Sequence, residues 1–233
     1  MHLNLHKKAY KKVLLIANGY EPYHDDISHL AESVHYIDPY SQDKNYIQSL
    51  ETFKKYLEDN NLDSKSTKII YGSGLEDKIG IQEYLDNEFS IAGNSFSKYR
   101  YLSNIYNLDE TIFNKKISLP ETSKSYHYKF LSKKYNSSGG LHVGNNIFSK
   151  DIYYQKYLPG KTYSISFIAN GEYSRILGLN QLFLVKDNIK FPFLHAGAMN
   201  LGLSEANIDF PKNFISSICN LYQIKGYCSI DFK

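Results

Sequence analysis

The 233-residue chain contains no tryptophan, only two cysteines and six prolines, and no long apolar run. A transmembrane helix needs about 18 to 20 consecutive apolar residues, so the sequence predicts no membrane span. Cys219 and Cys228 do not have the CxxC spacing, which favours free thiols over a disulfide or a zinc site. The segment Met1–Lys8 lacks the apolar core of a signal peptide, so we expect a cytoplasmic protein.

The chain also lacks a strong charge of either sign. Its net charge is +3 and its basic residues are spread along the sequence, whereas a nucleic-acid-binding domain has clustered basic residues. The 22 tyrosines often alternate with lysines, so no single Tyr–Lys pair indicates RNA binding. We therefore expect neither a nucleic acid nor a membrane as a partner.

The first part of the chain has the pattern of a small parallel α/β domain, which we place at residues 1–95. A continuous apolar run at 11–17 predicts a buried strand. The expected strands are 11–17, 35–38, 68–71 and 89–92, and the expected helices are 25–34, 45–59 (capped within 41–43), 81–87 and 97–108. No G-x-G-x-x-G follows the first strand, which weighs against a Rossmann-type NAD(P) enzyme.

Two short polar segments of this domain follow strands. Open α/β sheets bind ligands at the carboxyl ends of their strands, and the segment Gly72–Glu76 follows the third strand. We therefore expect Gly74 and Glu76 to contact substrate, although Glu76 could instead cap the next helix. The cluster of His24, Asp25 and Asp26 is better explained as a helix N-terminal turn than as a metal site.

The remaining residues, 96–233, have the pattern of an α+β domain with an antiparallel sheet. Residues 162–169 alternate with period two and end at Asn170–Gly171, a hairpin signal. A strand is expected at 226–232, and an amphipathic helix at 210–222. The residues predicted to form the buried face of this helix are Phe214, Ile215, Ile218 and Leu221.

A lysine strand followed by a glycine- and serine-rich turn stands out at 130–143. Lys133 lies near the end of the predicted strand, and the turn contains Ser137, Ser138, Gly139 and Gly140. Backbone N–H groups with few side chains around them approach phosphate oxygens closely, and an ammonium adds a point charge. The segment suits a polyphosphate, and by itself it is also compatible with a plain hairpin turn.

The order of these parts resembles the ATP-grasp superfamily. A small α/β domain is followed by a proline-marked entry, the lysine strand with its glycine loop, a "Q-x-Y-x-P-G" strand at 155–160, an antiparallel sheet and an "I-D-F" segment at 230–232. The resemblance covers nearly the whole chain and lies closest to the carboxylate–amine ligases. It implies an α/β domain followed by an α+β ATP-grasp domain.

The resemblance also implies roles for individual residues. Lys133 and the loop 137–140 would hold the phosphates of ATP, and Asp231 would bind Mg²⁺, an ion that prefers hard oxygen ligands. The hinge residues expected against adenine are Gln155, Lys156, Tyr157 and Leu158. The implied reaction joins a small-molecule carboxylate, activated as an acyl phosphate, to an amine, in cofactor or small-molecule biosynthesis. A homodimer is expected on the same ground.

The sequence departs from the family pattern in several places. Lys134 stands where many relatives have proline, Lys156 where many have glutamate, and Thr162 where some have a ribose-binding carboxylate. The chain ends two residues after Asp231, whereas relatives continue to a Glu-x-Asn segment that completes the metal site. We therefore expect a truncated chain, and the alternative function is a non-catalytic nucleotide-binding protein or an inactive fragment.

Three further residues are candidates for chemistry. Arg175, one of only two arginines, is expected to be catalytic as a phosphate or carboxylate clamp, because arginine makes bidentate contacts. His142 and His195 are candidates because histidine is the residue type used most often for acid–base chemistry at neutral pH, but a lone histidine in a loop or strand is more often structural.

Overall fold

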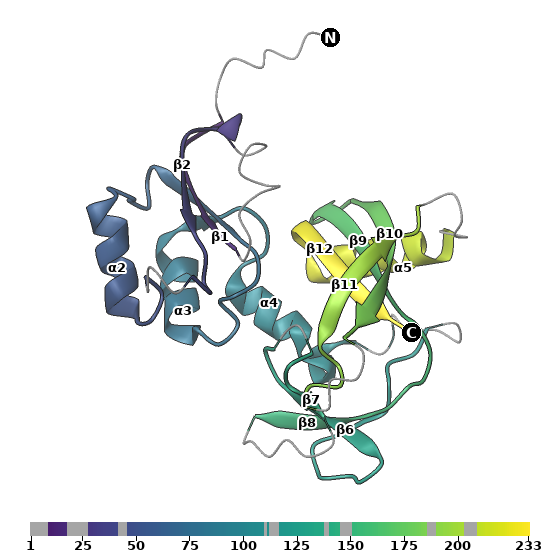
Figure 1. Cartoon of the computed structure of the whole chain (residues 1–233). Helices are drawn as coiled ribbons and strands as arrows, with labels where there is room; N and C mark the ends of the chain where they lie inside the picture. Colours follow the sequence, from purple (N-terminus) through teal and green to yellow (C-terminus); the bar gives the residue numbers. More distant parts are fainter. Residues whose placement is uncertain are drawn as a thin grey trace. The chain divides into compact units, whose positions relative to one another are not determined.

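The computed structural model divides into two compact units, Met1–Tyr99 and Arg100–Lys233, which are drawn in Figure 1. It describes residues 9–17, 28–41, 46–109, 111, 117–137, 140–144, 151–185, 190–202 and 209–233. The division falls within helix α4 (Phe96–Ser103), a few residues after the border that the sequence analysis placed at 95/96. Every helix in the described part is too short or too polar to cross a lipid bilayer.

The first unit is built on a four-stranded parallel sheet with the order β2-β1-β3-β4. Its strands are β1 (Tyr10–Ile16), β2 (Ala31–Ile37), β3 (Thr67–Tyr71) and β4 (Ser90–Ile91). β1 lies inside the sheet and is covered on both faces, because Leu14 and Ile16 join one hydrophobic cluster while Val13 and Leu15 join another. This explains its continuous apolar run and confirms the predicted parallel α/β arrangement.

The second strand is longer than the sequence predicted. Ala31–Val34, assigned to a helix over 25–34, belongs to β2, so that part of the prediction is wrong. Parallel pairing with β1 decides the conformation, because Ser33 and Val34 lie opposite Lys12 and Val13. The cluster of residues 24–26 lies outside the described residues.

Two helices follow, α2 (Leu50–Asp59) and α3 (Ile79–Glu88). The predicted start of α2 at residue 45 is wrong, as is its cap at 41–43. Ser49 is the N-cap: its hydroxyl accepts the N–H of Thr52 at 3.1 Å, and the Thr52 hydroxyl accepts the N–H of Ser49 at 3.1 Å. Ile47, which seemed to continue the helical period, is buried ahead of the helix.

The second unit contains two antiparallel sheets, with the orders β5-β8-β6-β7 and β11-β10-β9-β12. Their strands are β5 (Thr122–Ser123), β6 (Phe130–Lys134), β7 (Val143–Gly144), β8 (Ile152–Lys156), β9 (Thr162–Asn170), β10 (Ser174–Leu184), β11 (His195–Asn200) and β12 (Lys225–Phe232). The predicted β6–β7 and β9–β10 hairpins are confirmed. The short β5 and the strand β11 were not predicted.

Helix α5 (Asp209–Tyr222) covers one face of the β11-β10-β9-β12 sheet, as Figure 1 shows. Ile215, Ile218 and Cys219 are buried against Ile165 and Phe167 of β9, with other apolar residues around them. Leu221 was predicted to share this face, and that was wrong, because it is 48% exposed.

The predicted helix at 97–108 is interrupted. α4 ends at Ser103, and a 3₁₀ turn follows at Ile105–Asn107. Asn104 separates the two, because its side-chain oxygen accepts the N–H of Tyr106 at 3.1 Å and so begins a new turn.

Candidate functional site

Lys133 is held in place by the strands around it. It lies on β6 opposite Tyr153 of β8, and its ammonium Nζ is 5.8 Å from the centroid of the Tyr153 ring. Nζ also donates a hydrogen bond of 3.2 Å to Oε1 of Gln155, the next residue of β8 on that side. The lysine and the glutamine, both singled out in the sequence, are therefore direct neighbours.

The charge of Lys133 lies in a partly desolvated place. Burial lowers the pKa of its ammonium below the ordinary value, and the negative charge of Asp231 acts in the opposite direction. The structure thus brings the predicted phosphate lysine and the predicted metal carboxylate within electrostatic reach of each other. An ammonium with reduced hydration interacts more strongly with an added anion than it would in bulk water.

Asp231 belongs to a polar face of the second sheet. It lies on β12 opposite Ser164 of β9, and directly opposed residues of neighbouring strands share a face. That face is the one turned away from α5, since the alternate residues Ile165 and Phe167 pack against the helix. The other polar residues placed on this face by the strand pairing are Ser166, Asn180, Asn200, Tyr227 and Ser229.

Hydrogen bonds connect several of these side chains. The Ser166 hydroxyl oxygen lies 3.1 Å from the Tyr227 hydroxyl and accepts from Asn180 Nδ2 at 3.2 Å. Asn180 Oδ1 accepts in turn from Asn200 Nδ2 at 3.2 Å. The sequence analysis missed this network, although the period-two alternation of small hydroxyl residues in β9 is a signal for it.

The predicted phosphate loop is described in part. Ser138 and Gly139 lie outside the described residues. The Ser137 hydroxyl donates to the carbonyl of Lys134 at 2.8 Å and closes the turn after β6. Gly140 has a φ of +77°, and a Cβ there would lie 1.8 Å from the carbonyl oxygen of Phe193, so this position admits only glycine.

The predicted hinge residues Lys156, Tyr157 and Leu158 differ in their contacts and exposure. Lys156 is committed to Glu121, because its ammonium lies 3.1 Å from the carboxylate and its N–H donates to the Glu121 carbonyl at 2.9 Å. Tyr157 and Leu158 are exposed. Lys233 approaches Tyr157, with Nζ 5.6 Å from the ring centroid.

Arg175 lies on the same sheet face as Asp231, but it is distant from Asp231 along the strands. It is exposed and pairs with Ile168, whereas Asp231 pairs with Ser164. Four residues along β9 correspond to about 13 Å, so the structure does not bring the arginine beside the carboxylate. His142 and His195 are also exposed.

The donor set for a metal is small. No group of three or more His, Cys, Asp or Glu side chains that would suit a metal comes together among the described residues. Asp231 is one carboxylate with hydroxyl and amide oxygens on the same face. Mg²⁺ in nucleotide sites is often held by one or two carboxylates together with the phosphates, so these residues fit an ion that a nucleotide brings and would not hold one alone.

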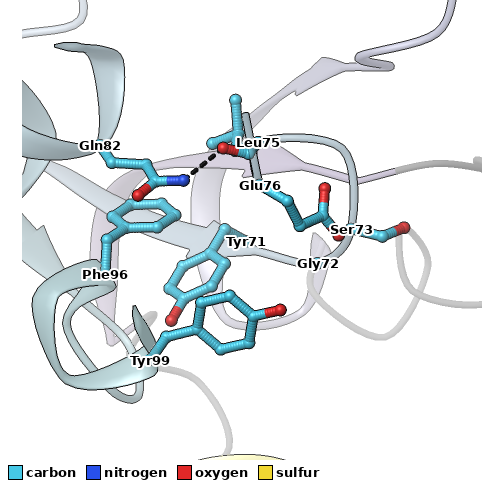
Figure 2. A pocket seen from close by; sticks show the side chains of 8 residues that line it. All are labelled: Tyr71, Gly72, Ser73, Leu75, Glu76, Gln82, Phe96 and Tyr99. Atoms are coloured by element: carbon cyan, nitrogen blue, oxygen red, sulfur yellow. Dashed lines mark hydrogen bonds between the residues drawn. The ribbon is translucent and has the colours of Figure 1, made fainter. Parts of the chain in front are cut away.

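The first unit contains a cavity of its own, shown in Figure 2. It lies at the carboxyl end of β3 and has a volume of about 250 Å³. The described residues that line it are Tyr71, Gly72, Ser73, Leu75, Glu76, Gln82, Phe96 and Tyr99. The expected ligand position after the third strand is thus a cavity with three aromatic rings in its wall.

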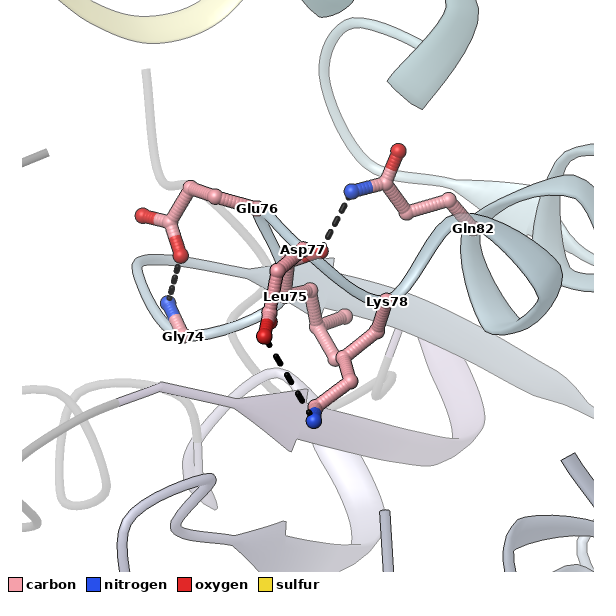
Figure 3. A network of polar contacts seen from close by, with 6 residues as sticks. All are labelled: Gly74, Leu75, Glu76, Asp77, Lys78 and Gln82. Atoms are coloured by element: carbon pink, nitrogen blue, oxygen red, sulfur yellow. Dashed lines mark hydrogen bonds and ion pairs between the residues drawn. The ribbon is translucent and has the colours of Figure 1, made fainter. Parts of the chain in front are cut away.

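Glu76 is fixed by its own loop, as Figure 3 shows. Its Oε2 accepts the N–H of Gly74 at 2.6 Å. Gly74 is buried with a φ of +108°, and a Cβ there would lie 2.5 Å from Pro39. The alternative role as a helix cap is wrong, because α3 is preceded by Lys78 and has no side-chain cap.

The aromatic walls were missed by the sequence analysis. The Tyr71 ring stacks on Phe96 with centroids 4.0 Å apart, and its hydroxyl donates to the Asn94 carbonyl at 3.1 Å. Asp86 of α3 fixes the start of α4, since its carboxylate accepts the N–H of Phe96 at 2.8 Å and that of Ser97 at 2.7 Å. The position of Tyr71 directly before a glycine turn was the available signal.

Comparisons with known proteins agree with this geometry. A family model described as an ATP-grasp domain matches residues 102–232. A search of curated proteins found no match. Among solved structures, an ATP-grasp superfamily protein from Archaeoglobus fulgidus is 16% identical with a TM-score of 0.64, and the match covers 95% of this chain and 76% of that one.

Other structural neighbours are larger. The biotin carboxylase domain of the Hydrogenobacter thermophilus 2-oxoglutarate carboxylase, in complex with MgADP, is 12% identical with a TM-score of 0.62; the match covers 97% of this chain and 61% of that one. The L-amino acid ligase from Bacillus licheniformis is 12% identical with a TM-score of 0.57, with 97% and 64% covered. At these identities the likeness concerns the fold.

Proposed function

Because this chain belongs to the ATP-grasp family, we propose that it binds ATP in the second unit and uses it to join a carboxylate to an amine. One observation carries the proposal. The ammonium of Lys133 lies in a partly desolvated place beside Gln155 and within the field of Asp231, where a triphosphate would supply the missing negative charge.

The roles proposed for individual residues follow the sequence analysis. Lys133 and the loop residues Ser137, Ser138, Gly139 and Gly140 would contact the phosphates. The adenine would lie near the strand and hinge residues Gln155, Lys156, Tyr157 and Leu158. Asp231 would hold Mg²⁺ together with the phosphates, and the ion would supply charge neutralisation at the phosphoryl group. Arg175 would act on a charged group only if the substrate reaches its part of the sheet.

The proposed reaction has two steps. A carboxylate oxygen attacks the γ-phosphorus of ATP, so that a P–O bond forms while the bond to ADP breaks. The neutral amine then attacks the carbonyl carbon, phosphate leaves, and the amine nitrogen loses a proton. In the first step, the Lys133 ammonium would stabilise charge on the transferred phosphoryl group.

The names of the structural neighbours support this choice of reaction class. They include the L-amino acid ligase, a D-alanine–D-alanine ligase from Bacillus anthracis and a carboxyaminoimidazole ribonucleotide synthase complexed with ATP. The chain covers 64% of the first of these and 66% of the last. The ligase activity is therefore a proposal for this chain, and we also propose a cytoplasmic location and a homodimer.

Replacement of Lys133 tests the proposed nucleotide site. Lys133→Met keeps the length of the aliphatic chain and removes the charge, and we expect ADP and ATP affinity to fall at least tenfold, about 1.4 kcal/mol. Isothermal titration calorimetry with MgADP measures the change. Lys134→Met is the matched control, because side chains of successive strand residues point to opposite faces, and it should bind normally.

Two results separate the proposal from its alternative. Unchanged nucleotide affinity in Lys133→Met would overturn the proposed site. A protein that binds ATP but never forms ADP in the presence of acids and amines would instead be the non-catalytic nucleotide-binding protein. That alternative is favoured by the single carboxylate, Asp231, at the proposed site among the described residues.

A further inference from the structure

The described side chains that line the cavity of the first unit carry charge of only one sign. Among these described residues, Glu76 supplies a carboxylate and there is no lysine or arginine. One of its oxygens, Oε2, is held by the Gly74 N–H, which fixes the direction of the carboxylate beside the cavity (Figure 2). A carboxylate in this setting attracts a cation and repels an anionic ligand.

Besides Gly72, Ser73 and Gln82, the remaining residues of the wall are apolar or aromatic. Tyr71 and Phe96 are stacked, Leu75 is buried, and Tyr99 faces the same space (Figure 2). Tyr99 and Glu76 line the same cavity. Burial raises the pKa of the Tyr99 hydroxyl, and the charge of Glu76 raises it further. Aromatic faces attract cations as well as apolar groups.

We propose that this cavity binds the amine substrate, with its ammonium group on Glu76 and its apolar body against Tyr71, Phe96 and Tyr99. The role as a substrate site rests on the proposed ligase function, whereas the binding itself does not. A volume of about 250 Å³ is below the roughly 300–1,000 Å³ of drug-sized ligand sites. The amine is therefore small, of about the size of an amino acid, and carries no carboxylate at the end that enters the cavity.

Gln82 and Asp86 of α3 hold the walls of this cavity in place. Gln82 is 1% exposed, and its Nε2 donates to the Leu75 carbonyl (Figure 3), which fixes the loop that carries Glu76. Asp86 anchors the first turn of α4 and with it the ring of Phe96. The cavity is thus built within one unit, and the geometry for the amine exists before any nucleotide binds.

Binding of 2-phenylethylamine to the full chain, without nucleotide, tests the proposal. Titration followed by NMR up to about 10 mM detects a millimolar Kd, and the wild type should bind this amine in preference to 3-phenylpropionate, its carboxylate counterpart. Glu76→Gln keeps an oxygen that can accept the Gly74 N–H and removes the charge. We expect it to weaken amine binding at least fivefold.

The matched control is Asp77→Asn, which removes a neighbouring carboxylate that is exposed and pairs with Lys78 at 3.6 Å. It should leave amine affinity unchanged. The proposal is overturned if 2-phenylethylamine does not bind, if 3-phenylpropionate binds as well, or if Glu76→Gln and wild type bind the amine equally. Lys133→Met should retain amine binding while it loses ADP, so failure of the nucleotide site and failure of this one are distinguishable.

Discussion

At the scale of single residues, Lys133 and Asp231 are two residues that the sequence predicted for one nucleotide site. Lys133 was singled out by its strand and glycine-rich turn, and Asp231 was chosen because its segment matches a family pattern. The structure adds a physical relation between them, since the carboxylate opposes the burial that lowers the lysine pKa. Arg175 was chosen for its chemistry and for a strand that in relatives faces the nucleotide and substrate, but its pairing with Ile168 of β9 places it about 13 Å from Asp231 along that strand.

The lowered pKa of Lys133 predicts a pH dependence of stability. Between that pKa and 10.5, the value of an ordinary lysine, the unfolded chain binds more protons than the folded one. The unfolding free energy contributed by this group therefore rises with pH through that window, and the contribution is lost as pH falls through the folded pKa. Lys133→Met should remove this rise.

The measurement is urea unfolding between about pH 8 and 10.5. Wild type minus Lys133→Met isolates the lysine, because the tyrosines and other lysines titrate in both proteins. Lys134→Met should follow the wild-type curve. A difference between wild type and Lys133→Met that is flat across this range would show that the ammonium is not desolvated.

At the scale of elements, helix α5 shows why a periodic pattern fixes a helix better than its buried face. Leu221 fits the apolar spacing, but the helix turns Ile215, Ile218 and Cys219 toward β9. The direction is set by the sheet that the helix packs on, and the helical period alone admits neighbouring faces. The period also failed to predict where α2 begins, because the capping box of Ser49 and Thr52 sets the first residue of that helix.

We predict unequal costs for two truncations on α5. Ile215→Ala should lower the unfolding free energy by about 2 to 5 kcal/mol, because the side chain is 1% exposed and its removal leaves a cavity. Leu221→Ala should cost less than about 1 kcal/mol, since that side chain is 48% exposed. Equal losses in urea unfolding would contradict the burial of this face.

At the scale of the whole molecule, the chain is two compact units. The first has one parallel sheet and the second has two antiparallel sheets, and each unit has hydrophobic clustering of its own. We propose that they correspond to the domains expected at 1–95 and 96–233. A ligand that binds only one folded unit stabilises that unit by RT ln(1 + [L]/Kd). The proposed nucleotide residues all belong to the second unit.

Differential scanning calorimetry tests this division. MgADP should raise the transition of the second unit by several degrees and leave that of the first unchanged, whereas 2-phenylethylamine should do the reverse. Lys133→Met serves as the control and should abolish only the nucleotide shift. One transition that both ligands raise equally would mean that the units unfold together.

The sequence by itself determined what depends on neighbours along the chain. The buried run of β1, the hairpin at Asn170–Gly171, and the lysine strand with its turn follow from side-chain pattern and turn chemistry within a few residues. These features were enough to single out Lys133, whereas Gln155 and Asp231 were chosen because their segments resemble those of the ATP-grasp family.

Only the tertiary structure decided which distant residues share a site. Strand register places Asp231 opposite Ser164 on the polar face and turns Ile165 toward α5. The cavity beside Glu76 depends on Asp86, which fixes the start of α4 so that the Phe96 ring stacks on Tyr71. Register and helix docking depend on the summed packing of whole surfaces, and no short stretch of sequence contains that information.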